Sequence, residues 1–169
     1  ILGGGTTDTT TGCAVAFSCT AGFASAAVNA ANIGILLQGA GQFISAAGGN
    51  ITLRGLGSHV STTNGDGILL SSAGPISTSG AGTISLTGID TGGFQGIRVD
   101  STSITAGSGD ITLTGNTNSL SSVSGVRLHG STTVSTSGQV AITAVGGTGT
   151  YAITTANTNS ITAGGNITL

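Results

Sequence analysis

The side chains of this 169-residue chain that could do chemistry together are few, and the best candidates are Arg98, Asp100, Arg127 and His129. They occur in two similar segments, Ile-Arg-Val-Asp at 97–100 and Val-Arg-Leu-His at 126–129. If the aliphatic residues face inward, these four side chains face outward on adjacent repeats, with Arg98 below Arg127 and Asp100 below His129. Asp100 then offsets part of the repulsion between the arginines on the diagonal. We interpret the four as a solvated charged patch, and contact with a ligand or partner is the second interpretation.

The acidic residues do not form a recognisable catalytic pair. Enzymes that act on glycans use two carboxylates, or a carboxylate with a basic residue, to move a proton or activate water. The chain has five acids, all aspartates, and no lysine. Asp66 and Asp110 lie in predicted turns, and Asp90 follows a predicted strand in a loop. Asp100 has no second acid and no lysine nearby with which to form a catalytic pair, so we predict that the protein is not an enzyme.

The two cysteines, Cys13 and Cys19, lie close together outside the regular part of the sequence. In a secreted protein they would close a short disulfide loop, and the alternative is a pair of small buried thiols. His59 and His129 lie far from both in sequence, which is not the spacing of a zinc site. We therefore predict no metal and no cofactor.

The elements that must position these side chains are short, and they recur. The segment Gly-Asp-Ile-Thr-Leu-Thr-Gly at 109–115 has related copies that begin 27 to 33 residues apart, at Gly49, Gly82, Gly138 and Gly165. A second segment, of the type Gly-Ile-Leu-Leu, occurs at 34–37, 67–70, 96–99 and 125–128, and a fifth, poorer copy is Tyr-Ala-Ile at 151–153. One aliphatic residue precedes each intervening turn: Ile44, Ile76, Ile104, Val134 and Ile161. Alternation with a period of two indicates strands, and the fixed spacing indicates a repeat protein.

Three short strands per repeat predict an all-β fold, a right-handed parallel β-helix with one rung for every 27–33 residues. Residues 1–32 are expected to form an irregular N-terminal segment or atypical rung, and residues 33–169 about five rungs. Stacked rungs would place Ile51, Ile84 and Ile111 in one inward column and Leu53, Leu86 and Leu113 in the next. A Greek-key sandwich is the competing fold, but it does not predict one motif in the same strand role at each repeat.

Composition excludes several partners. Only 5% of residues are charged and the net charge is −2, too small to indicate binding to nucleic acid or to a membrane surface. No apolar run approaches the roughly 18–20 residues that span a bilayer. The sequence starts at Ile1 and ends inside a repeat, so we interpret it as a processed protein or a piece of a longer one.

The repeated Gly-(Asn/Asp)-Ile-Thr-Leu-Thr-Gly motif, after Ile-Thr-Ala-Gly or Ile-Ser-Thr-Ser-Gly, resembles the repeats of large secreted bacterial exoproteins similar to filamentous-haemagglutinin-like adhesins. The resemblance covers residues 33–169. It implies a secreted or cell-surface β-helical shaft. The N-terminal secretion domain of such exoproteins is not evident in this sequence.

These observations together predict a non-enzymatic, structural or adhesive filament segment. The expected partners are continuing repeats or other copies of the chain stacked head to tail, with a cell-surface glycan or protein as a further partner. A glycan-binding or glycan-active β-helix is the alternative. A weaker alternative is an ice- or surface-binding threonine ladder, formed by the predicted outward column of Thr52, Ser85, Thr112, Ala141 and Thr168.

Overall fold

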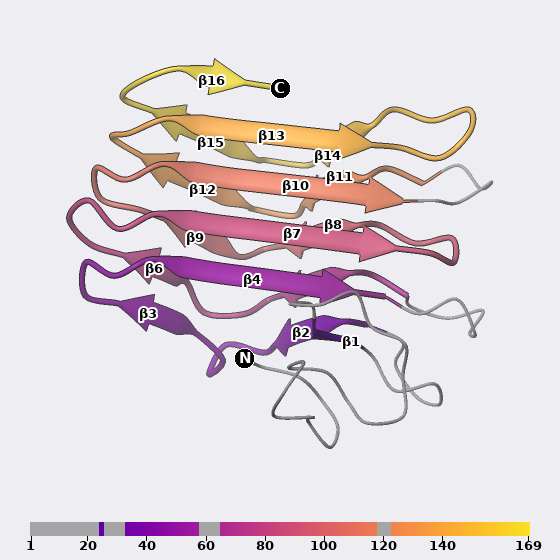
Figure 1. Cartoon of the computed structure of the whole chain (residues 1–169), viewed down its shortest axis with the longest axis horizontal. Coiled ribbons are helices and arrows are strands. Elements are labelled where there is room, and N and C mark those ends of the chain that lie inside the picture. The colour runs from indigo at the N-terminus through magenta and orange to yellow at the C-terminus, as the bar shows by residue number, and fades with distance from the viewer. Residues whose placement is uncertain (1–23, 26–32, 58–64, 118–122) are drawn as a thin grey trace.

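The computed structural model describes residues 24–25, 33–57, 65–117 and 123–169 (Figure 1). Cys13 and Cys19, with most of segment 1–32, lie outside the described residues, as does His59. Within those residues the chain forms strands and no helix, as the sequence predicts. It follows that no helix long and apolar enough to cross a membrane occurs among them.

The strands form three parallel sheets, and each successive strand along the chain joins the next sheet. Sheet 1 contains β2 (Ile35–Gln38), β5 (Ile68–Ser71), β8 (Ile97–Asp100), β11 (Val126–His129) and β14 (Ile153–Ala156). Sheet 2 contains β3 (Ile44–Ala46), β6 (Ile76–Thr78), β9 (Ser103–Thr105), β12 (Thr133–Thr136) and β15 (Ser160–Ala163). Sheet 3 contains β1 (Ala24–Ser25), β4 (Ile51–Leu56), β7 (Ile84–Asp90), β10 (Ile111–Thr117), β13 (Val140–Val145) and β16 (Ile167–Thr168).

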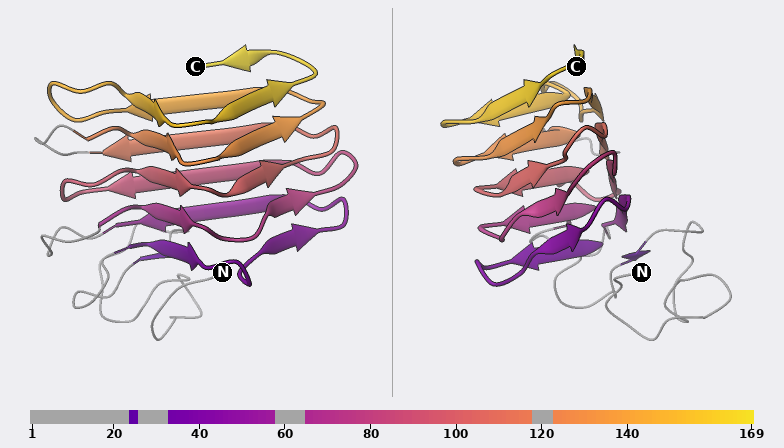
Figure 2. Two further views of the ribbon diagram at one scale, coloured as in Figure 1. Left: turned by 180° about the vertical axis from the view of Figure 1, so that it is seen from behind. Right: turned by 90° about the vertical axis from the view of Figure 1, so that its left-hand side faces the viewer.

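The chain coils as a right-handed solenoid of about four turns. In Figure 1 the strands of sheet 3 run from left to right in front, sheets 1 and 2 return behind them, and the chain climbs from the N-terminal to the C-terminal end. Figure 2 shows sheets 1 and 2 from behind, and a side view of the same stack. The predicted architecture of three strands per rung is therefore confirmed.

The core is a set of aliphatic columns that run along the axis of the coil. Ile84 pairs with Ile111, and Leu86 with Leu113, at equivalent places on β7 and β10. All four side chains are buried, whereas the intervening Ser85, Thr87, Thr112 and Thr114 are partly exposed. This alternation confirms the predicted strand register, because a slip of one residue would turn every aliphatic side chain outward.

Sheets 3 and 1 approach each other closely at one corner, and glycine pairs make that approach feasible. A Cβ atom on Gly88 would overlap the carbonyl oxygen of Gly96, and one on Gly115 would overlap that of Gly125. The glycines at the end of the sequence motifs therefore leave room for the backbone of the adjoining sheet. In the last described corner the register equivalent of Gly115 is Ala144, and there the adjoining Ile153 is only partly buried.

A second corner follows each strand of sheet 1 and uses a left-handed backbone residue. The equivalent residues after β2, β5, β8, β11 and β14 all have positive φ, from 48° to 94°: Gly39, Ser72, Ser101, Gly130 and Asn157. Glycine adopts this conformation freely, and asparagine tolerates it better than most other residues. The repeated corner holds the outward side chains of sheet 1 in the same direction from rung to rung.

Asp110 occupies the turn before β10, as the sequence predicts. Its Oδ1 atom accepts a hydrogen bond of 2.8 Å from the backbone N–H of Gln139, in the equivalent turn of the next rung. Asn50, two repeats before Asp110, makes the same contact: its Oδ1 atom accepts a hydrogen bond of 2.9 Å from the backbone N–H of Thr83. The carboxylate of Asp110 therefore has a structural role, which is to link two successive turns.

Candidate functional site

The four sequence-predicted site residues lie together on the outward face of sheet 1. Strands β8 and β11 are adjacent and parallel, and their register pairs Arg98 with Arg127 and Asp100 with His129. The alternation of each strand places Ile97 and Val99, like Val126 and Leu128, in the core, so the other side chains face solvent. We call Arg98, Asp100, Arg127 and His129 the charged patch.

Asp100 pairs with the arginine of its own strand. Its Oδ2 atom accepts a hydrogen bond of 2.8 Å from Arg98 Nε and lies 2.7 Å from Arg98 Nη2. This differs from the diagonal contact with Arg127 that the sequence suggested. Residues two apart on one strand share a face, and here the flexible arginine folds along the strand onto the carboxylate. The Asp100 side chain is only 13% exposed beneath this contact.

His129 extends the chain of contacts across two rungs. Its Nδ1 atom lies 3.5 Å from Asp100 Oδ1, and its Nε2 atom lies 3.3 Å from Asn157 Nδ2. If the Asn157 amide donates to Nε2, the ring proton of a neutral imidazole is on Nδ1 and faces Asp100. The positive-φ corner at Asn157 is what brings this side chain over His129.

Arg127 differs from Arg98 because no carboxylate among the described residues pairs with it. Among the described residues it makes no hydrogen bond or ion pair, and it is partly exposed. Two arginines and one aspartate give the charged patch a net charge of +1 when His129 is neutral. The chain as a whole carries −2, so the patch is a local concentration of positive charge on an otherwise weakly acidic protein.

Asp90 is a buried strand residue, which corrects its assignment to a loop after the strand. It is the last residue of β7 and points inward, as alternation from Ile84 requires. Its carboxylate accepts hydrogen bonds from the backbone N–H groups of Gly92, Gly93 and Phe94 at 2.7 to 3.0 Å. It therefore closes the loop that leads to β8 and presents no carboxylate to a substrate.

Asp66 is also buried, in a segment that the sequence assigned to a simple turn. Its Oδ1 atom accepts a hydrogen bond of 3.0 Å from the backbone N–H of Gln95, while Oδ2 has no partner. Burial raises the pKa of Asp66 from its ordinary 3.8 to about 6, although the Gln95 hydrogen bond and the charge of Arg98 act in the opposite direction. The Asn-Gly-Asp-Gly sequence gave no sign of this environment, because turn residues are usually solvated.

The described residues differ in which charged groups they expose. Asp100 is occupied by Arg98, and Asp66 and Asp90 are buried, so the described residues offer no exposed pair of carboxylates. In the same part of the chain no three acidic, histidine or cysteine side chains are grouped in a way that could hold a metal ion. Arg127, by contrast, presents a partly exposed guanidinium beside an imidazole.

The predicted threonine column is present on the outward face of sheet 3. The register aligns Thr52, Ser85, Thr112, Ala141 and Thr168 along the axis of the coil. Ala141 interrupts its row of hydroxyls, and Arg54 interrupts the neighbouring row that Thr87 and Thr114 continue. The face is therefore an incomplete hydroxyl ladder.

Comparison of the chain with protein-family models, with curated proteins and with solved structures finds no match. What the sequence and the structure show is therefore a β-solenoid repeat protein.

Proposed function

We propose that the chain is a structural and adhesive segment of an extracellular, non-enzymatic β-helical filament. The repeat motif and the solenoid favour a shaft, and the charged patch offers a contact for a surface. The localisation at the cell surface or outside the cell comes from the family resemblance.

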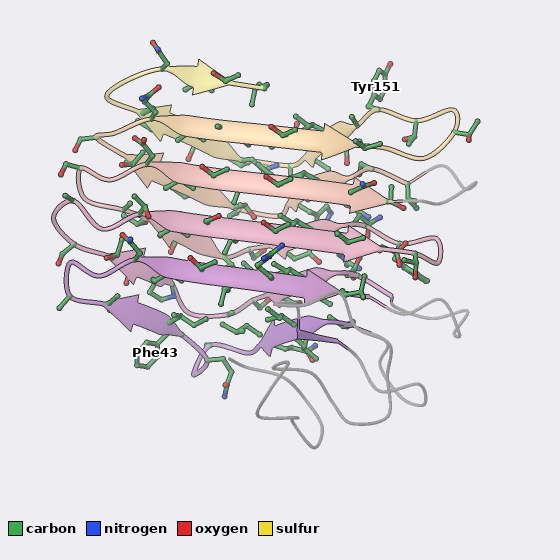
Figure 3. The ribbon with its side chains drawn as sticks, viewed as in Figure 1. Phe43 and Tyr151 are labelled. Atoms are coloured by element: carbon green, nitrogen blue, oxygen red, sulfur yellow. The ribbon has the colours of Figure 1, made fainter. Side chains whose placement is uncertain are left out.

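The observation that carries the proposal is where the exposed apolar side chains lie. Among the described residues, the large exposed hydrophobic side chains occur only towards the two ends of the coil: Leu36, Phe43, Val145, Tyr151, Ile167 and Leu169. Figure 3 labels Phe43 beside β3 and Tyr151 beside the loop after β13, at opposite ends of the stack. The middle rungs expose no such side chain among the residues described. The exposed apolar side chains at the C-terminal end favour association there, whereas Leu36 faces outward from sheet 1.

The last strand shows what an additional rung would cover. Ile167 pairs with Val140 and continues its column, but Ile167 is 47% exposed whereas Val140 is 1% exposed. Leu169 is 70% exposed. The outer edge of β16 also presents unpaired backbone groups, which recruit another strand. A further rung, from continuing repeats or from a second copy stacked head to tail, would bury these groups, and repetition of an open contact gives a fibre.

Sedimentation and electron microscopy of the 169-residue chain test the filament. We expect end-to-end stacks whose length grows with concentration. Ile167→Glu combined with Leu169→Glu should abolish stacking, because charges would be buried at the junction. Thr168→Glu lies between them but faces outward, so it is the matched control and should still stack. A stable monomer of the unmodified chain with Leu169 exposed to solvent would contradict the proposal.

A further inference from the structure

Strands β8 and β11 carry an arginine at the same place and different residues two positions later. On β8, Arg98 is followed by Asp100, and the two form an ion pair of 2.7 Å. On β11, Arg127 is followed by His129, which cannot supply a negative charge. The two rungs therefore allow a comparison between two equivalent arginines: Arg98, which has a carboxylate partner, and Arg127, which has none among the described residues.

The geometry of β8 shows which chemical group suits Arg127. Arg98 uses its Nε and Nη2 atoms together on one carboxylate oxygen, at 2.8 and 2.7 Å. Arg127 has the same strand position and direction, because the register is preserved, and no partner among the described residues. A planar carboxylate from outside the chain could therefore contact Arg127 as Asp100 contacts Arg98, at charge-assisted strength.

The imidazole of His129 completes this arrangement. It occupies the place over Asp100 and has a side chain that is 37% exposed, so it lies at the border of the solvent-facing surface. Arg98 lies directly below Arg127 and adds to the positive potential there, although its charge is largely compensated by Asp100. A negatively charged group gains from both cations and meets an aspartate whose charge is already paired.

The neighbouring side chains favour a sugar as the carrier of the carboxylate. In the next rung Thr154 lies above Arg127 and Ala156 above His129. The partly exposed Thr154 Oγ1 lies 2.7 Å from the buried Ser124 Oγ and keeps acceptor capacity for a hydroxyl group. The rung above the patch thus carries a hydroxyl and a small side chain, whereas Leu69 pairs with Arg98 on the rung below.

We propose that Arg127 and His129 bind the carboxylate of a uronic acid unit in an acidic polysaccharide. The proposal rests on the adhesive part of the proposed function and names its ligand class. It does not depend on filament formation, which sedimentation measures separately.

Binding of alginate, a polymer of uronic acids, tests the site in titration calorimetry at low ionic strength. The unmodified chain should bind alginate and should not bind neutral dextran. Arg127→Gln should weaken alginate binding by at least roughly tenfold, as expected for loss of one charge-assisted contact. Arg54→Gln is the matched control, because it removes an arginine from the outward face of sheet 3 and should keep the affinity.

His129→Asp is the more specific variant, because it gives Arg127 the internal carboxylate that Arg98 already has. We expect it to lower alginate affinity at least as much as Arg127→Gln, while circular dichroism and the melting temperature show that the fold is kept. Alginate binding that is unchanged in Arg127→Gln, or absent from the unmodified chain, would overturn the proposal. Equal binding of poly-glutamate would overturn the assignment to a glycan.

Discussion

At the residue scale, the four aspartates that the structure describes have different roles. Asp110 accepts a hydrogen bond from the next rung, Asp90 holds a loop closed, and Asp100 neutralises Arg98. Asp66 Oδ2 is buried without a hydrogen-bond partner, as is Asp100 Oδ1, which lies 3.5 Å from His129 Nδ1. Such an atom is costly when the carboxylate is charged.

We expect the stability of the protein to fall as the pH rises through the pKa of Asp66. Burial raises this pKa from 3.8 to about 6, so the folded chain holds the proton more tightly than the unfolded chain. The protonated carboxyl stabilises the fold fully below pH 3.8, and this stabilisation is lost as the pH rises through about 6. The shift corresponds to a loss of about 3 kcal/mol in the free energy of unfolding. Melting temperatures between pH 4 and pH 8 measure this change.

Asp66→Asn should remove that part of the pH dependence, since the amide keeps an acceptor for Gln95 and does not ionise. Asp110→Asn is the control, because Asp110 is exposed and its hydrogen bond to Gln139 can be kept by an amide oxygen. If the Asp66→Asn variant and the unmodified protein lose stability equally above pH 6, another group must be responsible.

At the element scale, the rungs are held in register by columns of aliphatic side chains and by narrow corners. The columns tolerate differences among Ile, Val and Leu because these side chains have similar volumes. The corner between sheets 3 and 1 tolerates less, because a backbone carbonyl faces each glycine there. A backbone group cannot rotate away as a side chain can.

Gly88→Ala should therefore destabilise the fold, by about 3 kcal/mol, because the added methyl group forces sheets 3 and 1 apart at Gly96. Gly41→Ala is the control, because a Cβ at Gly41 meets no atom within 4 Å. Its effect should stay within about 0.5 kcal/mol. Chemical denaturation of both variants measures the difference, and equal losses of stability would show that the corner is not tightly packed.

At the scale of the whole molecule, stability should vary along the axis of the coil. Each rung contacts its two neighbours, so a middle rung is supported on both sides and an end rung on one. Ile84, Ile111 and Leu113 are fully buried or nearly so, whereas Ile153, Ile161 and Ile167 are partly or largely exposed.

Amide hydrogen exchange should follow that gradient. We expect the slowest exchange in β7 and β10 and the fastest in β14, β15 and β16, because the end rung opens without disturbing the middle of the stack. When the chain is concentrated enough to stack, protection of β16 should rise and that of β10 should change little. Uniform protection of all rungs in dilute solution would mean that the solenoid opens as one unit.

The sequence by itself determined the architecture. Aliphatic residues such as Ile84, Ile111 and Leu113 alternate with polar ones and recur at a nearly constant spacing, and burying them all on one side admits few solutions besides a three-sided coil. The same period placed Arg98 under Arg127 and Asp100 under His129, because register follows from the columns. The position of the charged patch could therefore be predicted before its contacts were known.

Only the tertiary structure decided which polar atoms meet. Asp100 turns to Arg98 rather than Arg127, Asp66 is enclosed, and Asp90 accepts three backbone N–H groups. Hydrogen bonds form over about 3 Å and depend on rotamers and on the path of loops that differ between rungs. A repeat period fixes which residues are neighbours to within one strand spacing of about 4.8 Å, which is too coarse to choose among those contacts.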